Sequence, residues 1–120
     1  MSVVREATVG ASPREIIEAV HASIGRTEDV FLDIRQTGGR SVGIVVYEQY
    51  FSRVGNRIVL AVMADDFAGD GSSLVRVIVS GSSKGMVFNF DLGAAGDYAS
   101  EAMGIISRLG DFAEENARRP

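Results

Sequence analysis

Residues 81–85, with the sequence GSSKG, match the G-x-S-x-G pattern that sets a nucleophilic serine on a sharp turn. Such an elbow needs a strand, a turn and then a helix, so that backbone N–H groups form an oxyanion hole. Residues 86–91 instead show a period of two, which indicates another strand. His21 precedes Ser83 in the chain, whereas that class of hydrolase places its histidine last. We therefore interpret the segment as a β-bulge or hairpin bend and predict no catalytic residue in it.

Nitrogen and sulfur side chains that bind metals are scarce in this chain. It has one histidine and no cysteine, which excludes thiolate zinc sites and cysteine nucleophiles. Asp65, Asp66 and Asp70 with Gly71 resemble a calcium loop, but their spacing does not match the EF-hand pattern. Aspartate and glycine favour turns for reasons of their own backbone chemistry, so we expect an ordinary acidic turn. We predict neither a metal site nor a cofactor.

Three carboxylates on predicted strands, Asp33, Glu48 and Asp91, have the right chemistry for general acid–base catalysis if two of them converge. No pair among them has a spacing that demands a shared site. A small carboxylate-based enzyme is therefore the least favoured interpretation, and we expect a protein without enzymatic activity.

Composition restricts the classes of partner. The 120 residues carry a net charge of −4, and the basic residues are scattered singly apart from Arg118 and Arg119, so the positive footprint of a nucleic-acid-binding protein is missing. No run approaches the 18 to 20 apolar residues of a membrane span, and no signal peptide is recognisable. We expect one soluble, cytoplasmic domain over residues 1–120, with residues 117–120 frayed.

The first elements are a strand over residues 3–9 and a helix that begins after Ser12. Ser12 as N-cap, Pro13 at the first helical position and Glu15 three residues after the cap make a capping box. A single helical stripe then carries Ile16, Ile17, Val20 and Ile24.

A half-buried strand is expected from residue 28 to Gly38 and Gly39. Residues 41–54 and 57–64 predict a hairpin with Gly55 and Asn56 as its two-residue loop, so that Val54 lies opposite Arg57. One face of that hairpin is plainly core and carries Val45, Tyr47, Phe51, Ile58, Leu60, Val62 and Ala64. The other face is also largely apolar, although it includes Glu48.

Two more strands are predicted, over residues 74–79 and around Met86, Phe88 and Phe90. A C-terminal amphipathic helix with Asp97 as N-cap places one apolar stripe along Tyr98, Ala102, Ile105, Ile106, Leu109, Phe112 and Ala113. The layout is an α+β two-layer domain: strand, helix, four or five antiparallel strands, helix. Both helices are expected on one face of the sheet.

The second sheet face then lacks a helix to cover it. Large contiguous apolar patches are uncommon on soluble monomers, so we expect this face to form a homo-oligomer interface with Glu48 and Arg57 at its rim. The predicted interface residues are Val46, Tyr50, Val59, Ala61 and Met63. The alternative is a small-molecule pocket between the sheet and the C-terminal helix, lined by Tyr47, Tyr98 and Ile105, in which an apolar ligand would raise the melting temperature.

Three segments carry a family resemblance: YEQY at residues 47–50, GNRIVL at residues 55–60 and SGSSKGMVFNFDLG at residues 80–93, before the C-terminal helix. Together they resemble a family of small uncharacterised bacterial proteins classed as a domain of unknown function. The resemblance implies a bacterial α+β domain and brings no activity, cofactor or catalytic residue. The order of elements is also similar to that of helix-grip proteins.

Overall fold

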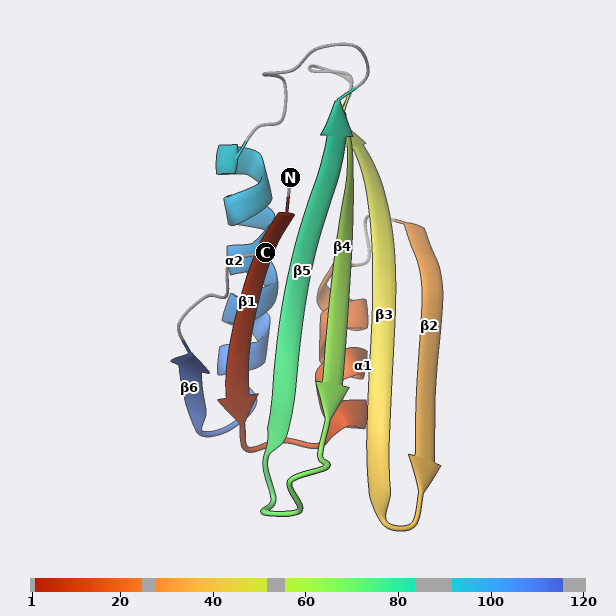
Figure 1. Ribbon diagram of the computed structural model, residues 1–120, viewed down its shortest axis with the longest axis vertical. Helices are drawn as coiled ribbons and strands as arrows, with labels where there is room; N and C mark the ends of the chain where they lie inside the picture. Colours follow the sequence, from red (N-terminus) through yellow and green to blue (C-terminus); the bar gives the residue numbers. More distant parts are fainter. Residues whose placement is uncertain (1, 25–27, 52–55, 84–91, 116–120) are drawn as a thin grey trace.

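The computed structural model describes residues 2–24, 28–51, 56–83 and 92–115. Its strands form one antiparallel sheet in the order β2-β3-β4-β5-β1-β6 (Figure 1). The predicted α+β class is confirmed. The elements, in chain order, are β1 (Ser2–Val9), α1 (Pro13–Ser23), β2 (Glu28–Thr37), β3 (Arg40–Phe51), β4 (Asn56–Asp65), β5 (Ser73–Ser83), α2 (Leu92–Ser107) and β6 (Phe112–Glu115).

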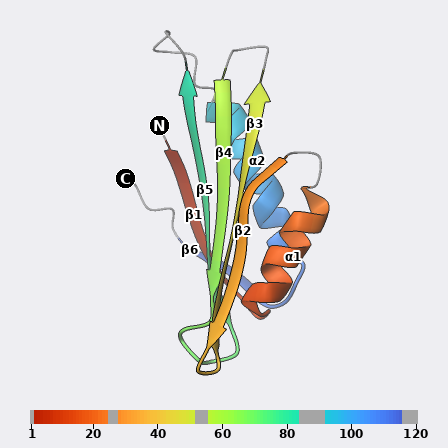
Figure 2. The same cartoon turned by 90° about the vertical axis from the view of Figure 1, so that its right-hand side faces the viewer.

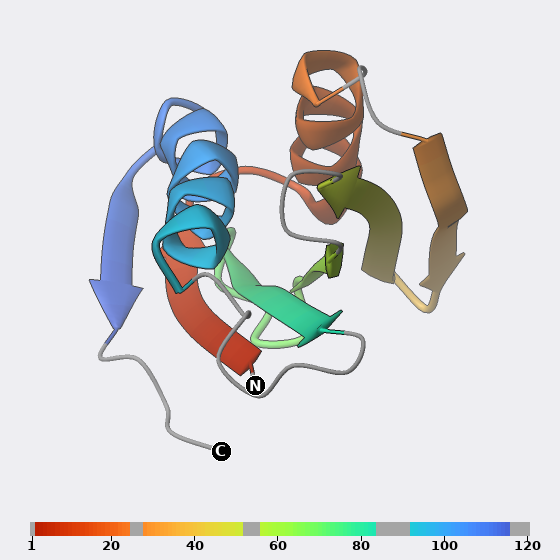
Figure 3. The same ribbon diagram turned by 90° about the horizontal axis from the view of Figure 1, so that it is seen from above.

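Both helices cover the same face of the sheet, as predicted (Figure 2). α1 contacts β3 and β4, α2 contacts β5, β1 and β4, and the helices contact each other. Seen from above, the sheet bends around the helices, so its other face is convex (Figure 3). The layer between sheet and helices is the hydrophobic core, whose largest fully buried side chains include Tyr47, Ile16, Ile17, Ile24, Ile58, Leu60 and Ile106.

The capping box predicted at the start of α1 is present. The Glu15 N–H donates to Ser12 Oγ at 3.1 Å, and the Ser12 N–H donates to Glu15 Oε1 at 3.1 Å. These two bonds satisfy donors that a helix N-terminus leaves without intrahelical partners. They fix where α1 begins and so direct its apolar stripe onto the sheet.

α1 approaches β3 closely at Gly43. A Cβ atom built on Gly43 would lie 2.6 Å from Cγ1 of Ile17, which is fully buried. The missing side chain therefore lets the helix lie directly on the strand. Any larger residue at position 43 must displace Ile17 or the helix.

The β2–β3 hairpin has a two-residue loop, and the β3–β4 hairpin does not. Gly38 and Gly39 have φ angles of +58° and +78°, as a type I′ turn requires, and the flanking residues Thr37 and Arg40 pair. In the second hairpin Phe51 pairs with Asn56, so Asn56 belongs to β4 and the predicted Gly55–Asn56 loop is wrong. Residues 52–55 lie outside the described residues.

The C-terminal region departs further from the prediction. α2 begins at Leu92, ahead of the predicted cap at Asp97, and ends at Ser107. Phe112 and Ala113, expected on the helix, instead belong to β6 and pair with β1. Gly110 explains the change of direction, because a Cβ atom there would overlap the backbone of Gly10. The strand predicted around residues 86–90 lies outside the described residues.

Candidate functional site

The serine of the G-x-S-x-G match lies in a strand. Ser83 is the last residue of β5 and pairs with Asn56, while Gly81 pairs with Ile58 in an unbroken register. No bulge interrupts β5 from Gly81 to Ser83, and beyond Ser83 the predicted bend stays a prediction. Residues 84–91, including Lys84, are outside the described part of the chain.

The single histidine is a neighbour of a buried tyrosine. His21 lies in the last turn of α1, and its Nδ1 is 3.1 Å from the hydroxyl oxygen of Tyr47, whose side chain is fully buried. The two rings are nearly parallel, with an interplanar angle of 18° and centroids 6.3 Å apart. This contact joins α1 to β3 and gives the tyrosine hydroxyl a polar partner at the edge of the core.

The aspartates at the β4–β5 connection accept hydrogen bonds from the chain itself: Asp65 and Asp70 within the turn, and Asp66 from the start of β3. Asp65 Oδ1 accepts from the Phe67 N–H, and Asp66 Oδ1 accepts from the Ser41 N–H at 2.7 Å. Asp70 accepts from both the N–H and the hydroxyl of Ser72; the hydroxyl bond is the first cause of a lowered pKa at Asp70. Within the described residues, no three acidic or histidine side chains group as metal ligands would.

Two of the three strand carboxylates bind arginines of their own chain. Asp33 Oδ2 accepts from Arg35 Nε at 2.8 Å, a bond that raises the pKa of Arg35. Glu48 Oε1 accepts from Arg57 Nη1 at 3.0 Å. Asp33 and Glu48 therefore belong to separate ion pairs, and Asp91 is not among the described residues.

The sheet face opposite the helices, which we call the outer face, carries a continuous row of apolar residues. Val4 pairs with Ile78, Ile78 with Ala61, Ala61 with Val46 and Val46 with Phe31. Opposite residues of antiparallel strands share a face, so these five side chains line up across β1, β5, β4, β3 and β2. We call this set the apolar row. Among the described residues, no helix covers it.

Four of the five predicted interface residues are half-buried on this face: Val46, Val59, Ala61 and Met63. Tyr50 belongs to β3 and pairs with Arg57, but its side chain is outside the description. Sequence reasoning missed Phe31, Ile78 and Val4 as members of the row. The period of two assigned Phe31 to one face of its strand, but only the register between strands shows that these three side chains align with Val46 and Ala61.

Three arginines on the outer face form ion pairs with carboxylates of the same chain. Arg57 contacts Glu48, and Arg35 contacts Asp33, as described above. Arg76 Nε donates to Glu6 Oε2 at 2.6 Å, and the Glu6 side chain is only 4% exposed. The three arginines therefore lie beside the apolar row with a carboxylate each.

The residues predicted to line a ligand pocket lie in the layer between sheet and helices. Tyr47 and Tyr98 are buried members of the core, and Ile105 packs against it. Two pockets lined by described residues lie elsewhere, beside the β2–β3 turn and the β4–β5 connection. One, of about 350 Å³, is lined by Gly10, Ala11, Ser12, Glu15, Arg40, Asp66, Gly69, Gly71 and Ser72. The other, of about 320 Å³, is lined by Arg35, Gln36, Thr37, Arg40, Ser41, Val42 and Phe67.

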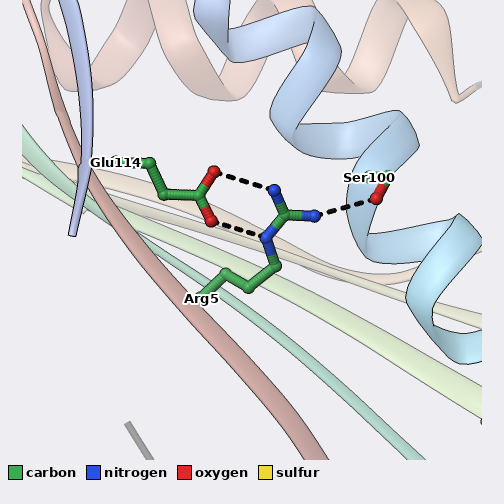
Figure 4. A network of polar contacts seen from close by, with 3 residues as sticks. All are labelled: Arg5, Ser100 and Glu114. Atoms are coloured by element: carbon green, nitrogen blue, oxygen red, sulfur yellow. Dashed lines mark hydrogen bonds and ion pairs between the residues drawn. The ribbon is translucent and has the colours of Figure 1, made fainter. Parts of the chain in front are cut away.

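A polar network at the other edge of the sheet was not predicted. Arg5 on β1 donates through Nε and Nη2 to the two carboxylate oxygens of Glu114 on β6, and through Nη1 to Ser100 on α2 (Figure 4). One guanidinium thus joins β1, the first strand, to α2 and β6, the last two elements of the described chain. Its pKa is raised by the hydrogen bond to Glu114. The geometry is that of a structural clamp, because each guanidinium nitrogen donates to a partner within the chain.

Comparison with known proteins agrees with the family resemblance. A family model described as a family of unknown function, DUF6054, matches residues 1–110. The chain belongs to the DUF6054 family. A search of curated proteins finds no match. In the part of this DUF6054 chain that the structure describes, neither helix has the length and hydropathy needed to cross a bilayer.

Two solved structures are similar to this DUF6054 chain. The 18 kDa protein CC1736 from Caulobacter crescentus is 13% identical, with a TM-score of 0.41, and the match covers 91% of this chain and 95% of that one. TTHA0849 from Thermus thermophilus is 11% identical, with a TM-score of 0.37, and the match covers 91% of this chain and 97% of that one.

Proposed function

We propose that this DUF6054 domain is a non-enzymatic, self-associating module and that a second copy of the chain covers the outer face. The observation that supports this most strongly is the apolar row, which crosses five adjacent strands without a polar interruption. Burial of apolar surface is the main favourable term in most protein associations. A symmetric pair of identical faces lets one surface bury itself.

The row is part of a wider apolar surface. Ile44 and Met63 pair with each other beside it, and Val59 lies on its other side, next to Glu48. Phe31, at the end of the row, is 52% exposed and extends this apolar surface to the edge strand β2. Contiguous apolar surface of this kind on a protein commonly marks an interaction site.

The charges around the row favour a second copy as the occupant. Each of Arg35, Arg57 and Arg76 has a carboxylate partner in its own chain. These three arginines therefore bring no uncompensated positive charge to a contact with a second copy, although the whole chain carries −4. Desolvating an unpaired charge would otherwise oppose association.

Curvature determines where contact is closest. The outer face is convex across the strands, so two copies meet first at the central strands β4 and β5 (Figure 3). Ala61 lies there in the apolar row, between Val46 and Ile78. Contact concentrated on a few central residues gives a modest interface, and the association should therefore depend on protein concentration.

The absence of cysteine supports a reducing compartment such as the cytoplasm. It also means that a single introduced thiol can be modified selectively, which gives a direct test. An Ala61→Cys variant contains a single thiol in the apolar row, and Ala22→Cys places the same thiol on the exposed surface of α1. We expect modification of the thiol in Ala61→Cys by a soluble reagent to slow as protein concentration rises, while Ala22→Cys reacts at a constant rate. Equal behaviour of the two variants would contradict the proposal.

A further inference from the structure

We infer that β2 pairs in antiparallel fashion with β2 of a second copy, about a two-fold axis at Ile34. This contact uses the edge of the sheet and therefore goes beyond the outer-face association proposed above. It extends the sheet instead of stacking on it. The inference rests on the edge position of β2, its backbone geometry and its charges.

β2 is the more open of the two edges of the sheet. It spans ten residues, and in the described part of the chain it pairs with β3 alone. The opposite edge, β6, has four residues and ends with Glu114 and Glu115. Short length and charge are the usual ways in which proteins protect a sheet edge from pairing, and β2 lacks the first of them.

The β2–β3 turn determines which backbone groups face this edge. Thr37 and Arg40 flank the two-residue Gly38–Gly39 loop, so they form a hydrogen-bonded pair. Hydrogen-bonded and non-hydrogen-bonded pairs alternate along an antiparallel ladder. The N–H and C=O groups of Leu32, Ile34 and Gln36 therefore point away from β3 and are available to another strand.

Charge selects the register between the two copies. A two-fold axis normal to the sheet at Ile34 places Asp33 opposite Arg35 of the second copy, and the same pair recurs on the other side of the axis. An axis at Asp33 or at Arg35 would instead set like charges directly opposite each other, which is destabilising. The Asp33–Arg35 contact of 2.8 Å within one strand shows that both side chains lie on the same face.

The shape of the strand selects the same register. A register shift between Asp29 and Phe31 marks a bulge, and the turn begins at Gly38. The regular part of β2 is therefore residues 31–37, whose midpoint is Ile34. An axis at residue 32 or 36 would run the paired strand into the bulge or the turn.

Pairing at this register also covers apolar side chains. Phe31 and Leu32 are 52% and 39% exposed, and they lie on opposite faces of the strand. With the axis at Ile34, Phe31 lies beside Thr37 of the second copy, and Leu32 lies beside Gln36. Both faces of the edge therefore gain contacts from the same pairing.

The inference is tested by removing one outward N–H group. Gln36→Pro deletes a donor that faces the free edge and costs no bond to β3, whereas the control Gln36→Ala keeps the donor. We expect sedimentation equilibrium to show that Gln36→Pro halves the mass of the assembly and that Gln36→Ala leaves it unchanged. An unchanged mass for Gln36→Pro would overturn the inference.

A charge exchange tests the register. Asp33→Arg sets two positive charges opposite each other across the axis, because position 33 of one copy faces Arg35 of the other, and it should halve the mass. The double variant Asp33→Arg with Arg35→Asp restores opposite charges at both places and should restore the mass. Failure of the double variant to restore the mass, with folding verified by circular dichroism, would reject the axis at Ile34.

The contact at the β2 edge and the contact at the outer face can be disrupted separately. The edge axis is normal to the sheet and the face axis is parallel to it, so the two contacts together are compatible with a closed tetramer. We expect Ala61→Arg to leave the edge dimer and Gln36→Pro to leave the face dimer. If the wild type is a dimer that Ala61→Arg alone disrupts, the edge contact is overturned. If it is a dimer that Gln36→Pro alone disrupts, the proposed function is overturned. A wild-type monomer would overturn both the edge contact and the proposed function.

Discussion

The guanidinium of Arg5 and the carboxylate of Glu114 form a two-point ion pair, with 2.7 Å from Nε to Oε2 and 2.8 Å from Nη2 to Oε1. The pair attaches β6, the last described strand, to β1 and α2. Arginine matches a carboxylate with two parallel N–H bonds, which makes this geometry more specific than a single contact.

Glu114→Gln should lower the free energy of unfolding at neutral pH by about 0.5–1 kcal/mol, because the pair is partly exposed and screened. Hydrogen bonding to Arg5 lowers the pKa of Glu114 below its ordinary value of 4.5. The pair therefore stabilises the fold above that value, and its contribution is lost as the pH falls through the lowered pKa. Urea titrations at neutral pH and below pH 4.5 should show a weaker acid dependence in the variant. Glu115→Gln, which removes a neighbouring charge but keeps the pair, is the control.

Gly43→Ala should destabilise the fold by about 1–3 kcal/mol, because the added methyl group meets buried Ile17 on α1. Gly104→Ala is the matched control. A Cβ atom at Gly104 meets nothing within 4 Å, so alanine there should stabilise α2 by about 1 kcal/mol. Thermal unfolding measures the stability of both variants. A Gly43→Ala variant as stable as the wild type would contradict the close contact between α1 and β3.

Arg76→Gln should destabilise the fold more than Arg57→Gln. The Glu6 side chain beside Arg76 is 4% exposed, whereas that of Glu48 beside Arg57 is 41% exposed. Removing a partner from a largely buried carboxylate costs about 3 kcal/mol, and removing one from an exposed pair costs at most about 1 kcal/mol. Denaturant unfolding of the two variants gives the comparison, and equal losses would show that the burial of Glu6 is unimportant.

Sequence reasoning predicted the faces of the β3–β4 hairpin correctly from a wrong register. The predicted pairing set Val54 opposite Arg57, whereas Arg57 pairs with Tyr50, four residues earlier. Side chains alternate with a period of two, so a shift by an even number of residues leaves every side chain on its predicted face. Val46, Ala61 and the other residues of the outer face were therefore placed together in spite of the error.

The end of α2 could not be predicted because the apolar pattern there suits two structures. Phe112 continues the helical stripe, yet it packs against the core from β6. What decides between them is the contact between the backbones of Gly110 and Gly10, with the Gly10 N–H donating to Asp111 O at 2.8 Å. That contact joins residues from opposite ends of the chain, and local periodicity carries no information about it.

Only part of the apolar row was predicted, because local periodicity carries no information about which strands pair. Periodicity within the hairpin identified Val46 and Ala61, which are neighbours across one pair of strands. Val4, Phe31 and Ile78 join the row from other strands, through pairings that only the assembled sheet shows. The clamp between Arg5 and Glu114 was missed because β6 itself was missed.

Sedimentation equilibrium of Ala61→Arg over a range of protein concentrations tests the central claim most directly. The substitution puts a charge into the apolar row on the central strand β4, and Ala22→Arg puts the same charge on the exposed surface of α1. The account predicts that wild type and Ala22→Arg form the same assembly and that Ala61→Arg has half its mass. An assembly of unchanged mass in Ala61→Arg would contradict it.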